Sequence, residues 1–220
     1  LATDMDGDGI DDFVYGDKAL DRISMVTQTK KDDVEATREA FRADQASGVI
    51  GPSAVATVSE SVDGRTMRNL VVANGGGNEI LLFSRNLVAA AGSPDLFLPP
   101  QRFFVGSNPS ALAVADVDAD GITDVVVANT GSNDLSVMLG TIGADGRWTM
   151  KAGPRLEAGG ASPAGIALGD FVRADGSRGR DGTLDIAVTT PGSNSANILA
   201  GRAGIGNIGN ATITIVDVTR

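Results

Sequence analysis

The feature that most constrains this sequence is an internal repeat of between 50 and 60 residues. Residues 70–80 (LVVANGGGNEI) and 125–135 (VVVANTGSNDL) nearly superpose. Segments that begin at Pro52, Pro109 and Pro163 read PSAVA, PSALA and PAGIA, so these prolines are spaced 57 and 54 residues apart. Even spacing of this kind indicates an array of similar supersecondary units. We therefore expect four repeat units, approximately at residues 1–50, 51–107, 108–161 and 162–220.

Each unit shows the same order of strand and turn signals. A Pro opens an alternating strand of small and apolar residues, and an acidic, Gly-containing loop follows. A continuous apolar run, a turn rich in Asn and Gly, a third strand and a variable fourth segment complete the unit. The apolar runs predict strands that are covered on both faces; they lie at residues 13–15, 70–73, 125–128 and 186–188. Three or four short strands per unit predict an all-β fold, a β-propeller of about four repeats.

Two stretches depart from this order. Asp4 already begins an acidic loop, so the first unit is expected to lack its opening strand. Because a ring of only four blades strains blade geometry and a missing strand leaves an open edge, we expect residues 1–220 to be a segment of a larger propeller, or to be completed by another chain or by further sequence. The alternative is a single domain that closes as a four-bladed ring. Residues 32–42 have helical propensity and an acidic start, but their place in the period favours an outer strand or surface loop.

The acidic loops at residues 4–12 (DMDGDGIDD) and 116–124 (DVDADGITD) have carboxylates at positions one, three, five and nine. A Gly after the third carboxylate permits a sharp turn, and the backbone carbonyl at position seven can join the carboxylates. Such a set of oxygen ligands is typical of calcium sites. The candidate ligands are Asp4, Asp6, Asp8, Ile10, Asp12, Asp116, Asp118, Asp120, Ile122 and Asp124. An EF-hand is not indicated, because Tyr15 and Val127 stand where its Glu would be.

The alternative is that these Asp residues are solvated turn formers. Two unit charges 4 Å apart repel by about 4 kcal/mol at an effective dielectric constant of about 20. Four converging carboxylates accumulate several such terms, so the loop would open or take up protons unless a cation neutralised it. We therefore expect Ca²⁺ in the first and third loops.

The other two units have altered loops. In the second unit, Ser59, Ser61 and Asp63 replace the leading carboxylates, and we expect this loop to close without metal. In the fourth unit, Asp170 opens the loop, and Asp181 and Asp185 close it. The insertion between them contains Asp175, Arg178 and Arg180. One interpretation of this loop is a third calcium site. The alternative is that the arginines of the insertion neutralise the carboxylates of the loop.

An Asp-rich loop followed by an apolar strand and an Asn-x-Gly-x-Asn turn resembles the VCBS and FG-GAP repeats of integrin-α-like β-propellers. The resemblance covers almost the whole chain and is most specific in the first and third units. It implies a calcium-stabilised propeller that is secreted, extracellular or at the cell surface, commonly as one module of a larger protein. It does not imply one activity.

The amino-acid composition excludes several kinds of catalytic and metal site and argues against some partners. The chain has no His and no Cys, which excludes imidazole and thiol catalysis and His- or Cys-ligated metals. A net charge of −10 argues against nucleic acid and anionic membranes as partners, and no apolar run is long enough to span a bilayer. We expect a non-enzymatic module for surface structure, adhesion or protein–protein assembly, with other protein chains or modules as partners.

The alternative function is a carbohydrate-binding or carbohydrate-cleaving propeller, with glycans as partners. The Asn-Gly turns could bind sugar hydroxyls, but turn chemistry explains them equally well. Trp148 and Tyr15 are the only Trp and Tyr, and Tyr15 falls in a strand expected to be buried. An intracellular enzyme with phosphate or nucleotide substrates is a more distant third, since the sequence contains no phosphate-binding P-loop.

Overall fold

The computed structural model describes residues 1–31, 34–89, 96–173, 177, 179–201 and 214–217. Within these residues the chain is almost entirely β-structure, interrupted by three short 3-10 helices: η1 (Gln45–Ser47), η2 (Gly75–Gly77) and η3 (Pro191–Ser193). None of the helices in this part of the chain has the length and apolar character needed to cross a membrane.

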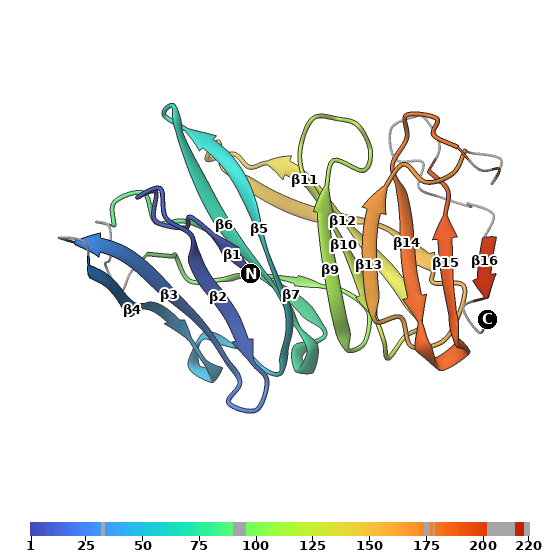
Figure 1. The fold of residues 1–220 in the computed structure, drawn as a ribbon, viewed down its shortest axis with the longest axis horizontal. Helices are drawn as coiled ribbons and strands as arrows, with labels where there is room; N and C mark the ends of the chain where they lie inside the picture. Colours follow the sequence, from blue (N-terminus) through green and yellow to red (C-terminus); the bar gives the residue numbers. More distant parts are fainter. Residues whose placement is uncertain (32–33, 90–95, 174–176, 178, 202–213, 218–220) are drawn as a thin grey trace. The chain divides into compact units, whose positions relative to one another are not determined.

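The strands form four four-stranded sheets within the described residues (Figure 1). We call them blades one to four. Blade one contains β1 (Ala2–Thr3), β2 (Asp12–Asp17), β3 (Arg22–Lys31) and β4 (Val34–Ala43). Blade two contains β5 (Pro52–Val62), β6 (Arg65–Asn74), β7 (Glu79–Phe83) and β8 (Gln101–Phe104). Blade three contains β9 (Pro109–Ala115), β10 (Asp124–Asn129), β11 (Asp134–Ile142) and β12 (Trp148–Glu157). Blade four contains β13 (Gly165–Gly169), β14 (Asp185–Thr190), β15 (Ser195–Leu199) and β16 (Thr214–Asp217).

Strand order within every blade follows chain order. In blade three, for example, β10 pairs antiparallel with β9 on one side and β11 on the other, with Val126 opposite both Ala113 and Val137. A four-stranded antiparallel meander is the building unit of β-propellers. The predicted all-β, propeller-type fold is therefore confirmed.

The chain divides into two compact units, Leu1–Arg102 and Phe103–Arg220. The first unit holds blades one and two apart from the end of β8, and its core includes Val14, Met25, Leu81 and Phe83. The second unit holds blades three and four, and its core includes Val126, Leu135, Ile186 and Val188. Thr130 and Ser110 of blade three donate to the carbonyl of Pro163, which precedes β13, at 2.6 and 2.9 Å. These bonds join the two blades of the second unit.

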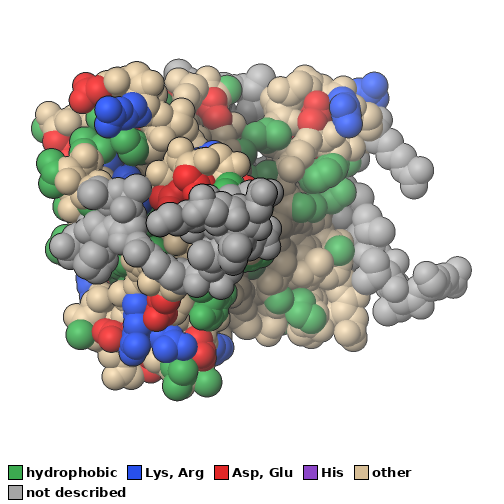
Figure 2. All heavy atoms as spheres, turned by 60° about the vertical axis from the view of Figure 1, so that its left-hand side comes forward, with side chains coloured by type: hydrophobic (Ala, Val, Ile, Leu, Met, Phe, Trp, Pro, Cys, Tyr) green, Lys and Arg blue, Asp and Glu red, His purple; other side chains and the backbone are tan. Residues whose placement is uncertain are grey.

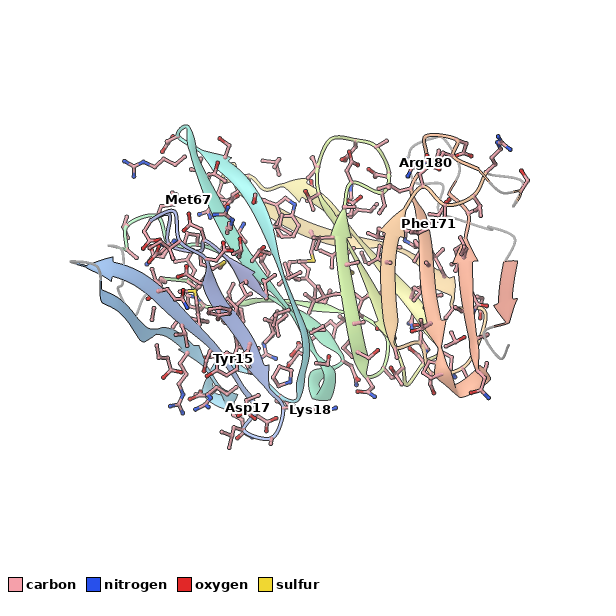
Figure 3. All side chains as sticks on the ribbon, viewed as in Figure 1. Tyr15, Asp17, Lys18, Met67, Phe171 and Arg180 are labelled. Atoms are coloured by element: carbon pink, nitrogen blue, oxygen red, sulfur yellow. The ribbon has the colours of Figure 1, made fainter. Side chains whose placement is uncertain are left out.

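Two of the apolar runs are buried as predicted. Residues 70–73 in β6 and 125–128 in β10 are all 0% exposed. The prediction was wrong for β2, where Val14 is 1% exposed but Phe13 and Tyr15 are 48% and 45% exposed. The side chain of Tyr15 is labelled in Figure 3. Successive side chains on a strand point to opposite faces. Only the face that carries Val14 packs into the core of the first unit, so its neighbours remain in solvent.

Blade one also corrects one expectation and confirms another. The first unit does have an opening strand, since Ala2 and Thr3 of β1 pair with Phe13 and Asp12. Only two residues precede the loop, and a bridge this short has no alternating pattern to reveal it. The strand interpretation of residues 32–42 is confirmed over β4; residues 32–33 lie outside the described residues. Tertiary pairing with β3 overrides the helical propensity there.

Candidate metal centres

Three carboxylates come together in the first loop and three in the third. One carboxylate oxygen from each of Asp4, Asp6 and Asp8 lies within 4.8 Å of the others, and Asp116, Asp118 and Asp120 form the equivalent group. We call these groups the first and third acid trios. Among the described residues they are the only such clusters. Clustered carboxylate oxygens are the donors that calcium and magnesium prefer.

Backbone N–H groups hold the leading carboxylate of each trio. In the third loop, Asp116 accepts from Asp120 at 3.1 Å and from Gly121 at 2.8 Å. In the first loop, Asp4 accepts from the amides of Gly7 and Gly9 at 2.7 and 3.1 Å. These bonds wrap the loop around the first carboxylate, so the turn forms without help from distant residues.

The wrapping requires left-handed backbone at two places in each loop. Gly9 and Gly121, at position six, have φ of +86° and +88°. Position four is also left-handed, with Gly7 at +88° in the first loop but Ala119 at +61° in the third. Glycine adopts this region without cost, whereas an alanine there is strained by about 1 kcal/mol or more. The third loop therefore holds a strained residue beside its trio.

The residue at position seven makes the same backbone hydrogen bond in both loops. The amides of Ile10 and Ile122 each donate to the carboxylate at position five, Asp8 or Asp120, at 2.8 Å. Both amides are thus occupied in fixing the position-five carboxylates. The predicted role of the Ile10 and Ile122 carbonyls as ligands stays a prediction.

The carboxylate at position nine lies outside the trio and is fully buried. Asp12 and Asp124 are both 0% exposed. Through Oδ2, Asp12 accepts from Met5 at 2.7 Å and Asp124 accepts from Val117 at 2.8 Å. Each carboxylate thereby ties the end of its loop back to the loop's beginning.

The same buried residue also fastens the loop to the third strand or the segment after it. Oδ1 of Asp12, Asp124 and Asp185 accepts from the amides of Gln28, Gly140 and Gly201 at 3.2, 2.7 and 2.8 Å. In blade two, Asn69 takes the same role and accepts from Arg85 at 2.8 Å. We call these four residues the loop anchors. Sequence reasoning assigned the three Asp residues to metal alone and missed this role.

A signal for the anchor was present in the sequence. The second unit keeps an oxygen-bearing side chain, Asn69, although it has lost the leading carboxylates. Retention of that group where no metal loop remains indicates a structural purpose.

The second loop is replaced by a tight hairpin. β5 and β6 pair along their whole lengths, with Val62 opposite Arg65, so that only Asp63 and Gly64 form the turn. Their φ angles are +51° and +74°, as a type I′ hairpin turn requires. Ser59 and Ser61 lie in the paired strand and do not converge on a point. Because the loop has gone, Nδ2 of Asn69 is buried without a hydrogen-bond partner in the described structure.

The fourth loop keeps part of the pattern around its insertion. Asp170 accepts from the amides of Asp181 and Gly182 at 3.1 and 2.9 Å, as Asp116 does from its own loop. Asp185 is 0% exposed and accepts from Phe171 and Val172 at 2.6 and 2.8 Å. Val172 occupies the place of the second carboxylate and is buried. Asp175 and Arg178 lie outside the described residues, and Arg180 is exposed.

Burial and charge repulsion act together on the loop carboxylates. Burial raises the pKa of Asp6, and the neighbouring Asp8 raises it further. Burial also raises the pKa of the anchors Asp12 and Asp124, although the backbone amides that they accept from act in the opposite direction. A bound divalent cation would lower the pKa of the trio carboxylates by favouring their charged form.

The Asn-Gly turns and the single Trp have structural roles. Asn74 and Asn129 are 0% exposed, and Nδ2 of each donates to neighbouring side chains, including Glu79 at 2.9 Å and Asp134 at 2.8 Å. Asn78 and Asn133 take the left-handed positions of their turns. Trp148 is 3% exposed and donates to the carbonyl of Thr123 at 2.9 Å. The buried Asn74, Asn129 and Trp148 are therefore not available to a sugar, whereas Asn78 and Asn133 are exposed.

Residues 108–146 match the family model of the FG-GAP repeat, and this segment contains β9, the third acid trio, β10 and β11. No curated protein sequence matches the chain. Among solved structures, the chain is similar to one described as BBS1N in complex with ARL6DN, soaked with lead, with 12% identity and a TM-score of 0.40. That similarity covers 99% of this chain and 88% of the other. This chain is thus a β-propeller-type protein whose third blade matches the FG-GAP repeat over residues 108–146.

Proposed function

We propose that this protein is a non-enzymatic β-propeller module, stabilised by calcium, that serves in extracellular or cell-surface structure, adhesion or protein–protein assembly. The observation that carries the proposal is the acid trio, which occurs with the same geometry in blades one and three. Three carboxylates within 4.8 Å of one another repel strongly unless a cation lies among them.

The position of the trios favours a structural role for the metal. Each trio lies in the loop between the first two strands of its blade, and the anchor that ends the loop is hydrogen-bonded to the third-strand region. A cation held there links three strands of one blade. Because binding stabilises only the folded state, each site adds about 2.7 kcal/mol when free calcium exceeds its dissociation constant about a hundredfold.

The carbohydrate alternative gains little support. Trp148 and the turn residues Asn74 and Asn129 are buried. Phe13 and Tyr15 are both exposed on one face of β2, but neither side chain lines the cavities of about 410 and 270 Å³ in the first unit. A sugar site normally presents aromatic faces together with convergent polar groups.

Thermal unfolding with and without a chelator tests the proposal. We expect the chelator to lower the melting temperature of the wild-type protein clearly. Replacing Asp8 or Asp120 by Ala should remove a large part of this sensitivity. The exposed Asp63, in the hairpin that replaces the second loop, provides the control, and Asp63→Asn should respond to the chelator as the wild type does. Identical melting curves with and without the chelator would refute the proposal.

A further inference from the structure

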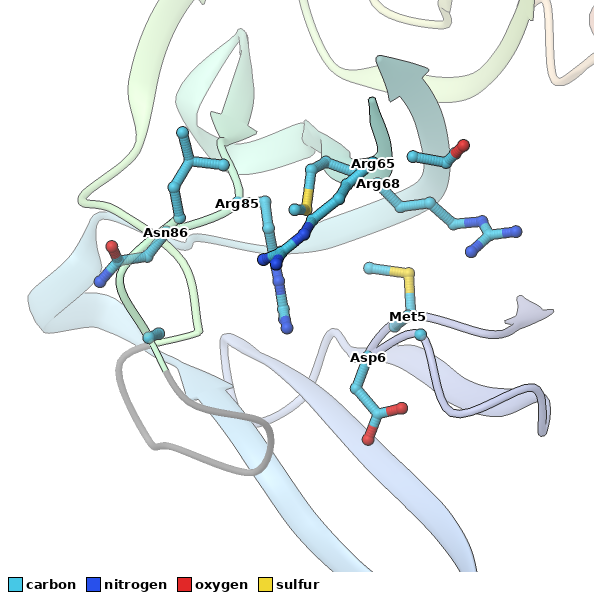
Figure 4. A pocket seen from close by; sticks show the side chains of 11 residues that line it. Met5, Asp6, Arg65, Arg68, Arg85 and Asn86 are labelled. Atoms are coloured by element: carbon cyan, nitrogen blue, oxygen red, sulfur yellow. The ribbon is translucent and has the colours of Figure 1, made fainter. Parts of the chain in front are cut away.

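A cavity of about 410 Å³ lies beside the first acidic loop, inside the first unit. β6 contributes Arg65 and Arg68, the segment after β7 contributes Arg85, and the loop contributes Met5 and Asp6 (Figure 4). On the molecular face shown in Figure 2, charged side chains of both signs lie in small groups among apolar ones. The cavity lining instead brings three arginines together with one carboxylate, that of Asp6, in a protein with a net charge of −10.

The arginines are fixed to different degrees. Arg85 is only 6% exposed, and its guanidinium lies 6.0 Å from the centre of the Phe97 ring. Burial lowers the pKa of Arg85, while Asp6 and Asp12 act against that change. Arg68 donates to the backbone carbonyl of Asp4, so β6 is tied to the acidic loop. A guanidinium in a confined site binds a carboxylate more strongly than one in open solvent, often through two parallel hydrogen bonds.

The cavity continues into a second one of about 270 Å³. Both are lined by Arg65, Met67 and Leu87, and the second extends to Val62 and Asp63 at the tip of the hairpin. Leu87 is 42% exposed at this shared boundary. No aromatic side chain among the described residues lines either cavity. Guanidinium groups flanked by Met and Leu side chains match an acidic side chain flanked by apolar ones better than they match a sugar.

A calcium ion at the first acid trio would make the net charge around the cavity positive. Asp6 belongs both to the cavity lining and to the first acid trio, whose three carboxylates oppose the three guanidiniums. A divalent cation at the trio would leave the cavity net positive and would withdraw Asp6 from the arginines. The affinity for an anion should therefore rise when calcium is bound.

We propose that this paired cavity is a docking site for an acidic peptide segment of a partner protein, with a carboxylate held by the exposed Arg65, whose positive charge the buried Arg85 reinforces, and apolar neighbours held against Met67 and Leu87. The inference rests on the proposed function, because calcium at the first trio is what makes the net charge of the cavity positive.

Nuclear magnetic resonance titration of the whole chain tests the site. The probes are a blocked Leu-Glu-Leu peptide and its Leu-Gln-Leu analogue, each added with calcium and with a chelator. With calcium, we expect Leu-Glu-Leu to shift the signals of residues 65–68 and 85–87 with a millimolar dissociation constant. The Gln analogue should bind at least about tenfold more weakly, as should Leu-Glu-Leu to Arg65→Gln, because each change removes one partner of the charge pair. Arg42→Gln, on the exposed side of blade one, is the matched control and should bind as the wild type does.

The outcomes separate the two proposals. Calorimetric binding of calcium without any peptide-induced shift, or equal affinity for the Glu and Gln peptides, would overturn the docking site and leave the calcium proposal standing. Equal affinity for Leu-Glu-Leu with calcium and with chelator would also overturn the inference as stated. Absence of calcium binding in the same sample would refute the proposed function, and this inference with it.

Discussion

Oδ1 of Asp124 accepts a hydrogen bond of 2.7 Å from the backbone amide of Gly140. This bond connects the end of an acidic loop to β11, and equivalent bonds occur at Asp12, Asn69 and Asp185. All four anchors are 0% exposed. The loops are therefore fastened to their blades by protein groups, and any metal would act on a loop that is already positioned.

Replacing Asp124 by Ala should destabilise the protein by about 2–4 kcal/mol, because the buried amide of Gly140 and the half-buried amide of Val117 lose their acceptor. Asp124→Asn should cost markedly less, since Asn69 shows that an amide oxygen can serve the third strand. Urea unfolding in the presence of a chelator measures the anchor apart from any metal. If both variants lose the same free energy of unfolding, the anchor role is wrong.

Replacing Ala119 by Gly should stabilise the third loop, because Ala119 has a φ of +61°. Relief of left-handed strain is worth about 1–2 kcal/mol, and the flexibility of Gly in the unfolded chain takes back about 0.5–1 kcal/mol. The expected gain is about 0.5–1 kcal/mol by urea unfolding. Ala115→Gly, at the end of β9, is the control and should destabilise the protein. A loss of stability in Ala119→Gly would show that the loop is not strained there.

Lowering the pH should stabilise the metal-free protein and destabilise the calcium-bound protein. Burial raises the pKa of Asp6, Asp12 and Asp124. A carboxyl whose pKa is raised by folding binds its proton more tightly when folded, so its contribution to stability is present at low pH and is lost as pH rises through the folded pKa. At pH 4, near the ordinary Asp pKa of about 3.9, these groups should therefore stabilise the metal-free protein more than they do at pH 7. With calcium bound, protons compete with the metal, and stability should fall over the same range.

Urea midpoints at both pH values, with calcium and with chelator, check this reversal. Asp21 is the internal counterexample, because hydrogen bonds from the Gly51 amide and from Gln45 lower its pKa. Its contribution is present above its unfolded pKa and is lost in acid, and Asp21→Asn removes it. The same direction of change in calcium and in chelator would contradict the assignment of Asp6 and the rest of its trio to a metal site.

Much of the fold was predictable because the repeat consists of residue types with strong local conformational preferences. The prolines at or just before the first strands of blades two to four and the buried runs of β6 and β10 follow from short-range patterns. The two-residue hairpin turn at residues 63–64 was not predicted, because the repeat led us to expect an acidic loop there. The exposure of Phe13 and Tyr15 did not follow, because it depends on which face of β2 is covered by another sheet.

The candidate site was predictable only in part. Spacing alone brought Asp4, Asp6 and Asp8 together, and likewise the third trio, because alternate residues of a tight loop point inward. Spacing could not show that Asp12 and Asp124 are buried acceptors, since an Asp at the end of a loop suits a metal or an amide equally well. The cavity was beyond sequence reasoning, because Arg65, Arg68 and Arg85 come from separate parts of blade two and meet residues of the first loop.

Isothermal titration of the metal-free protein with calcium tests the central claim most directly. We predict two ions for each chain, one for each acid trio, with Asp8→Asn and Asp120→Asn each removing one and the double variant removing both. Asn retains the oxygen that accepts from Ile10 or Ile122, so the loops should stay folded. Asp63→Asn should leave both sites intact. Absence of binding heat in the wild type, or unchanged stoichiometry in the double variant, would contradict the account.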